Sequence, residues 1–178
     1  MSSAGFLLDT NVLSELMRDG PAPAVLQWFA GQTAPLLHTS TVTQAEMLAG
    51  IAVLPAGKRR DALAQAAQQI FNKDFLGRCL AFDSAAAEHY ALVRAQRQHA
   101  GQPIHTEDAQ IAAIALAASM KLVTRNTKDF AEIDGLVLVP GELPLGELVP
   151  VRIDGAMTYD LTGVPAAASG QPLTADSL

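Results

Sequence analysis

The sequence contains little cysteine, few aromatic residues and no long hydrophobic run. Of its 178 residues, Cys79 is the sole cysteine and 5% are aromatic. One cysteine allows neither an internal disulfide nor a cysteine-rich zinc site, which predicts a reducing, cytoplasmic environment. No apolar stretch reaches the roughly 20 residues that span a bilayer, and residues 1–5 lack the basic start of an export signal. We therefore expect no membrane association.

Positive charge is also scarce. The chain has 12 lysine and arginine residues against 18 aspartate and glutamate residues, a net charge of -6. This balance argues against nucleic-acid binding driven by overall charge. It does not exclude a nuclease, because bound metal cations offset the charge of their acidic ligands.

The remaining composition is that of a folded domain, with 49% hydrophobic and 17% charged residues. At this length one domain with a sizeable core is expected. Strand patterns occur at 6–8, 36–40, 80–82, 122–124 and 136–139. Helical patterns occur at 11–17, 24–30, 44–53, 58–72, 84–100 and 109–120. The alternation predicts an α/β/α sandwich around a mostly parallel central sheet.

The character of the sequence changes near residue 141. Glycine, proline, alanine, serine and threonine dominate from there to Leu178, without a sustained helical period. We predict a globular domain over 1–140 and a C-terminal extension over 141–178, which lies on the domain or is partly disordered. Residues 149–153 have the pattern of a lone edge strand.

One acid follows an expected strand, and two more stand at the starts of expected helices. Asp9 ends the apolar run Phe6-Leu7-Leu8, at the edge where open α/β sheets bind ligands. Asn11 is placed to cap the next helix, which leaves Asp9 free for function. Glu46 has two open interpretations: a site ligand, or a member of a capping box with Thr43 as N-cap.

The third acid is Asp108, which we expect in the first turn of a helix. Ile111 and Ala115 share its helix face and should be buried, which places Asp108 on the core side and Glu107 toward solvent. Three unpaired carboxylates in one cleft raise each other's pKa unless a cation binds. Oxygen ligands without cysteine or histidine favour Mg²⁺ or Mn²⁺ over Zn²⁺.

A polar turn follows the strand pattern at 122–124. It contains Asn126, with an amide, and Asp129, with a further carboxylate; both residue types are also common turn formers. Arg125 and Lys128 would supply local positive charge to a nucleic acid there. Arg94 and Arg97, one helical turn apart, are further candidates for such charge.

Four segments together resemble the PIN-domain ribonucleases, particularly the VapC-like toxins and their FitB-type relatives. The order and spacing of the segments across residues 5–140 are more specific than any one of them. The matching residues are Leu8-Asp9-Thr10-Asn11-Val12, Thr43-Gln44-Ala45-Glu46, Asp108-Ala109-Gln110-Ile111-Ala112-Ala113, and Thr124-Arg125-Asn126 with Asp129-Phe130.

The resemblance implies a PIN-like nuclease domain over 1–140: an endoribonuclease dependent on Mg²⁺, with Mn²⁺ as an alternative, and usually the toxin of a type II toxin–antitoxin pair. The catalytic positions would be Asp9, Glu46, Asp108 and Asn126. The three acids would bind the metal ion, and Glu46 could instead orient the attacking water. The family's fourth position is commonly aspartate, so Asn126 puts a second metal ion in doubt.

The resemblance also implies partners and RNA contacts. The partners would be an RNA substrate and a cognate antitoxin, in a homodimer or a toxin–antitoxin hetero-oligomer. Thr10, Arg125, Lys128 and Asp129 are the expected substrate-binding residues.

Other classes fit less well. A phosphatase of the HAD type needs a second aspartate at Asn11, and a response-regulator receiver needs an acidic pair after the first strand. The stronger alternative is a PIN-fold protein that acts mainly with a DNA-binding antitoxin as a transcriptional repressor complex.

Overall fold

The computed structural model describes residues 5–18, 20–140, 151–157 and 160–165. The chain divides into two compact units, 1–145 and 146–178, which are described separately. No helix in the described part is long and apolar enough to cross a membrane.

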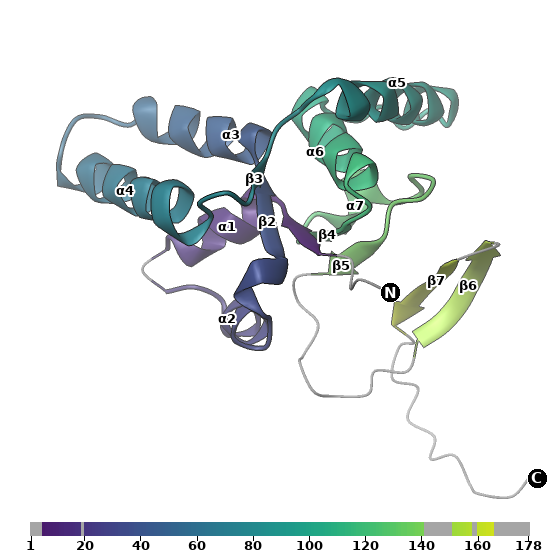
Figure 1. The fold of residues 1–178 in the computed structure, drawn as a ribbon, viewed down its shortest axis with the longest axis horizontal. Coiled ribbons are helices and arrows are strands. Elements are labelled where there is room, and N and C mark those ends of the chain that lie inside the picture. The colour runs from purple at the N-terminus through teal and green to yellow at the C-terminus, as the bar shows by residue number, and fades with distance from the viewer. Residues whose placement is uncertain (1–4, 19, 141–150, 158–159, 166–178) are drawn as a thin grey trace, which may run out of the picture. The chain divides into compact units, whose positions relative to one another are not determined.

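The first unit contains a five-stranded, wholly parallel sheet with the strand order β3-β2-β1-β4-β5 (Figure 1). The strands are β1 (Phe6–Leu8), β2 (Leu37–Ser40), β3 (Cys79–Leu80), β4 (Lys121–Thr124) and β5 (Leu138–Pro140). Seven α-helices lie in the described part of this unit: α1 (Thr10–Leu16), α2 (Pro23–Ala30), α3 (Thr41–Ala52), α4 (Lys58–Gln69), α5 (Ser84–His99), α6 (Thr106–Ala117) and α7 (Thr127–Phe130). A 3₁₀ turn at Ala34–Leu36 precedes β2, and a π-helical turn at Ile70–Asp74 follows α4.

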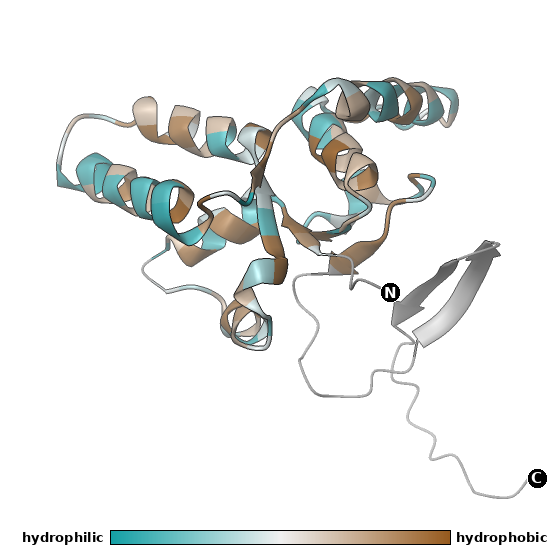
Figure 2. Ribbon diagram, in the orientation of Figure 1, coloured by the Kyte–Doolittle hydropathy of each residue, from teal (hydrophilic) through white to brown (hydrophobic). Residues whose placement is uncertain are grey.

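Side-chain alternation along the strands gives the sheet two buried faces. Leu7 and Leu122 are paired in register and pack with α5 and α6, whereas Leu8 and Val123 pack on the other face with α1, α2 and α3. These four side chains are fully buried. In Figure 2 the strands β1 and β5 are hydrophobic, whereas α4 is largely hydrophilic. Helices therefore cover both faces, and the predicted α/β/α sandwich is confirmed.

The strand order has its reversal at the centre of the sheet, between β1 and β4. From β1 the chain proceeds to β2 and β3 on one side, and then returns to β4 on the other side of β1. The crevice at such a reversal lies outside the carboxyl ends of the strands. Here Asp9 follows β1, and Thr124 ends β4.

In the second unit, β6 (Val151–Met157) and β7 (Asp160–Pro165) pair in an antiparallel hairpin with a register shift between Ile153 and Gly155. The strand pattern expected at 149–153 thus falls partly on β6, and residues 149 and 150 lie outside the described residues.

Candidate active site at the carboxyl edge of the sheet

Asp9 is buried at the end of β1, with 2% of its surface exposed. Its Oδ1 accepts a hydrogen bond from Thr10 N at 2.7 Å, and its Oδ2 accepts one from Thr124 Oγ1 at 2.7 Å. Burial raises the pKa of Asp9, and the nearby Glu46 carboxylate raises it further, although the hydrogen bonds that Asp9 accepts oppose this shift. The hydrogen bonds hold the carboxylate in place, and no lysine or arginine among the described residues pairs with it.

The expectation that Asn11 caps α1 is wrong. The helix begins at Thr10, so Asp9 itself is the N-cap. Asn11 instead joins the residues that follow β1 and β4. Its Nδ2 donates to Asp9 Oδ2 at 2.7 Å, and its Oδ1 accepts from Arg125 N at 3.0 Å. Asn11 therefore fixes the β4–α7 loop against the end of β1.

The capping box at Thr43–Glu46 is also wrong. Helix α3 begins at Thr41, and Ser40 is the N-cap, accepting from Thr43 N at 3.0 Å. Glu46 is therefore more than one turn inside the helix, too far along to cap it. Its Oε2 accepts a hydrogen bond from Thr10 Oγ1 at 2.5 Å, so its side chain faces the turn that follows Asp9.

Asp108 lies in the first turn of α6 and is half-buried, whereas Glu107 is exposed, as the helix pattern predicts. Burial raises the pKa of Asp108 to about 6, and the charges of Asp9, Asp129 and Glu46 contribute, with a smaller opposing effect from His105. The three predicted acids thus share one electrostatic environment. Within the described residues, however, no three acidic, histidine or cysteine side chains lie close enough together to enclose a metal ion.

The polar turn after β4 contributes to the same edge. Asn126 N donates to Thr124 Oγ1 at 3.0 Å, and the Asn126 amide donates to Asp129. The side chain of Asn126 is therefore oriented toward Asp129, one of the acids whose charge raises the pKa of Asp108. Lys128 is exposed in this turn. Roles for these residues in catalysis or RNA binding stay predictions.

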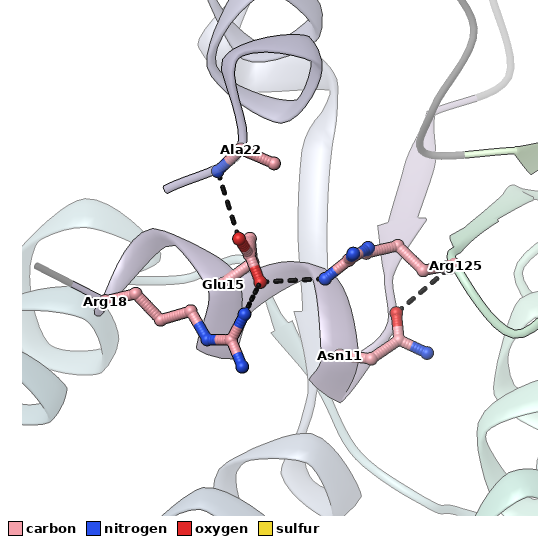
Figure 3. Close-up of polar contacts among 5 residues, drawn as sticks. All are labelled: Asn11, Glu15, Arg18, Ala22 and Arg125. Atoms are coloured by element: carbon pink, nitrogen blue, oxygen red, sulfur yellow. Dashed lines mark hydrogen bonds and ion pairs between the residues drawn. The ribbon is translucent and has the colours of Figure 1, made fainter. Parts of the chain in front are cut away.

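Sequence reasoning missed a second buried carboxylate, Glu15, beside this edge (Figure 3). Its Oε1 accepts from Ala22 N at 3.0 Å, and its Oε2 pairs with Arg18 at 3.0 Å and Arg125 at 2.7 Å. These contacts lower the pKa of Glu15, the hydrogen bond from Ala22 most of all. The spacing of Glu15 and Arg18, three residues apart on one helix, is the local signal for this cluster, whereas the contact with Arg125 spans 110 residues.

The prediction that Arg97 offers surface charge is wrong. Its side chain is buried, with 5% exposed, and donates to Gln102 and to the carbonyl of Ala131. The Arg94 guanidinium donates to the carbonyl oxygen of Ile104 at 2.8 Å.

A family model described as the PIN domain matches residues 6–136. This range includes Asp9, Glu46 and Asp108. The chain belongs to the PIN-domain family. Plasmid stability protein StbB of Pseudomonas syringae pv. tomato is 42% identical over 136 residues, covering 76% of this chain and 98% of that protein. VapC ribonuclease Y4jK of Sinorhizobium fredii is 39% identical over 133 residues, covering 75% and 94%. These matches confirm the resemblance to PIN-domain, VapC-type proteins.

The fold of this PIN-domain protein is similar to that of a chain in the solved structure of FitAB bound to an IR36 DNA fragment. The TM-score is 0.72 at 35% sequence identity, covering 78% of this chain and 96% of that chain.

A second family model, described as the TRAM domain, matches residues 114–165 and so extends past the PIN match into the hairpin of β6 and β7. Ribosomal protein uS12 methylthiotransferase RimO of Microcystis aeruginosa is 51% identical over 43 residues, which are 24% of this chain and 10% of that protein. The chain is thus also similar to the TRAM family, over a segment that begins within the PIN match and extends past it.

Proposed function

We propose that this protein is a Mg²⁺-dependent endoribonuclease, with Mn²⁺ as an alternative metal ion, and the toxin of a type II toxin–antitoxin system. One observation carries the proposal. Asp9, Glu46 and Asp108 share the carboxyl edge of the sheet, and in the described part of the chain none of them forms an ion pair with lysine or arginine. Carboxylates arranged in this way repel one another and destabilise the protein when no cation is bound, so the arrangement favours binding of a cation.

The donor set fits magnesium in kind, because it consists only of carboxylate and amide oxygens. Magnesium usually takes one or two carboxylates and keeps several waters, so it does not require three acids around one point. Asp9 and Asp108 would bind the ion, and Glu46 would bind it or act as the base that orients water. When bound, the ion supplies Lewis-acid stabilisation of the phosphate and favours an ionised water for in-line attack.

The remaining polar residues would orient these acids and the RNA. Thr124 and Asn11 donate to Asp9 Oδ2, which fixes the direction of its carboxylate. Thr10 donates to Glu46 in the same way. Asn126, at the position where the family commonly has aspartate, brings no charge and favours one metal ion over two.

RNA binding would depend on local charge. Lys128 is exposed beside the site, and Arg125 lies in the same turn, where Glu15 holds its guanidinium. With Thr10 and Asp129, these residues are the proposed contacts to the RNA.

The protein would act in the cytoplasm with a cognate antitoxin, as a homodimer or a toxin–antitoxin hetero-oligomer. The name of Y4jK as a VapC ribonuclease and the FitAB complex support this assignment. The nuclease would comprise residues 1–140, and residues 141–178 would form an extension similar in part to the TRAM domain.

An RNA cleavage assay with purified protein and cellular RNA tests the proposal. We expect cleavage with Mg²⁺, loss of cleavage with a chelator, and recovery when Mg²⁺ is restored. Asp9→Asn should remove both cleavage and growth arrest on expression while leaving the fold intact. Growth arrest by Asp9→Asn equal to that by the natural protein would refute the site.

The second candidate is a partner in a DNA-bound repressor complex with little or no nuclease activity. Asn126 at the fourth position and the solved FitAB–DNA complex favour it. Absence of cleavage of any cellular RNA, together with tight operator binding beside the antitoxin, would establish this candidate and refute the nuclease.

A further inference from the structure

Arg97 is a buried cation whose hydrogen bonds go to neutral groups. Its Nη1 donates to Gln102 Oε1 at 2.9 Å and to Ala131 O at 2.8 Å, while its Nε has no partner among the described residues. No carboxylate in the described part pairs with it. A buried, unpaired charge lowers stability. Ion pairing therefore does not account for the arginine at this position.

The two acceptors belong to the two segments that bring acids to the site. Gln102 lies in the loop that leads into α6, which contains Asp108. Ala131 follows α7, two residues after Asp129. The loop is held twice, because Gln102 N also donates to Arg97 O at 3.0 Å. One residue of α5 thus joins both acid-bearing segments.

Two neighbouring side chains of α5 show that this double contact is particular to Arg97. Arg94 holds only the first segment, through Ile104 O at 2.8 Å. Gln96 holds only the second, through Glu132 O at 2.8 Å and Asp134 N at 3.1 Å. Among these three, only Arg97 forms hydrogen bonds from one side chain to both segments.

We propose that Arg97 is a positioning residue that sets Asp108 relative to the Asp129 segment, without touching substrate itself. The proposal rests on the proposed nuclease function. A displacement of about 1 Å at a reacting group can cost roughly 100-fold in rate. A residue that fixes the separation of two acids therefore affects catalysis more than stability.

Arg97→Met tests the proposal, because methionine fills the space and removes the charge. Gln102 is exposed and Ala131 half-buried, so water can replace the lost donor. We expect a melting temperature within about 2 °C of the natural protein. Cleavage should fall roughly 10- to 100-fold and Mn²⁺ affinity, measured by calorimetry, about tenfold. RNA affinity measured without divalent cations should not change.

Two variants serve as controls. Arg97→Lys keeps an ammonium that can donate to both acceptors and should recover part of the cleavage and of the Mn²⁺ affinity. Arg94→Met makes the same substitution one helical turn away, at a residue that holds one segment, and should change both quantities less than about threefold.

Unchanged cleavage and Mn²⁺ affinity in Arg97→Met would overturn the proposal. The proposal would also be overturned if Arg97→Met lowered the melting temperature and if cleavage and Mn²⁺ binding fell only in proportion to the fraction of unfolded protein. Arg97 would then support only the fold. If the natural protein cleaves no RNA, the nuclease assignment fails, and the Mn²⁺ comparison still decides the role of Arg97. Absence of Mn²⁺ binding by the natural protein would overturn both.

Discussion

Asp9 is the N-cap of α1 and Glu15 lies in its last turn, and the two are almost equally buried, with 2% and 4% of their surface exposed. Their surroundings shift their pKa values in opposite directions. Glu15 has two arginines and a backbone N–H, and its pKa is lowered. Asp9 has uncharged donors and another carboxylate nearby, and its pKa is raised. The first arrangement favours the charged carboxylate, and the second is the one that the proposed metal site requires.

The largest effect expected from this comparison is on cleavage by Asp9→Asn. A metal ion contributes several kcal/mol of transition-state stabilisation, so the rate should fall roughly 1000-fold. The melting temperature should stay equal or rise, because the substitution removes a buried negative charge without a cationic partner. Cleavage kinetics and thermal unfolding on one preparation check this. A much lower melting temperature would show that Asp9 serves the fold.

Glu15→Gln should have the opposite profile. It removes the negative charge that pairs with Arg18 and Arg125, so the melting temperature should fall by about 5 °C. Cleavage per folded molecule should fall less than about tenfold, because Arg125 N remains bonded to Asn11. Cleavage kinetics and thermal unfolding of Glu15→Gln measure these two effects. A variant as stable as the natural protein would contradict a stabilising role for the Glu15 cluster.

The pH dependence of stability sharpens the contrast. The pKa of Asp108 is raised from 3.8 to about 6, so the folded state binds more protons than the unfolded state between these values. Its contribution is fully present below pH 3.8 and is lost as pH rises through about 6. Glu15, with a lowered pKa, contributes stability above its ordinary value of 4.5, which is lost as pH falls.

Melting temperatures from pH 4 to 7 without divalent cations check this. Relative to Asp108→Asn, the natural protein should lose stability across this range, and added Mg²⁺ should reduce the loss. Parallel pH curves for the two proteins would show that Asp108 does not titrate in this environment.

A smaller effect is expected from Asn126→Asp, which adds the acid that the family commonly has. Mg²⁺ affinity should rise about threefold to tenfold, because more ligand charge tightens binding. Calorimetry measures it. Weaker Mg²⁺ binding would show that the hydrogen bond from Asn126 to Asp129 matters more than added charge.

Lys128→Ala should have the smallest effect. Loss of one exposed cation should weaken binding to all RNA sequences similarly and reduce the slope of log affinity against log salt by about 0.7. Binding titrations at several salt concentrations measure the slope. An unchanged slope would remove Lys128 from the RNA contacts.

The sequence was sufficient to predict the sandwich and the location of the acids, because both follow from local patterns. Leu7 and Leu8 form a buried strand whose end is Asp9, and Asp108 shares a helix face with Ile111. The start of α3 was harder to predict, since Thr39, Ser40, Thr41 and Thr43 are all capable N-caps and the structure has Ser40 in that role.

Long-range partners were beyond local patterns. Glu15 meets Arg125 from 110 residues away, so nothing in either segment indicates an ion pair. Arg97 stands between the glutamines 96 and 98, a polar context typical of a solvated helix face, although the α7 region buries it. Tertiary contacts therefore determine the surroundings of both Glu15 and Arg97.

Calorimetric titration of Mn²⁺ into the natural protein, Asp9→Asn and Glu15→Gln tests the central claim most directly. If the unpaired acids form the metal site, the natural protein and Glu15→Gln should bind the ion, and Asp9→Asn should not. No binding by the natural protein, or equal binding by Asp9→Asn, would contradict the assignment of this edge as a metal centre.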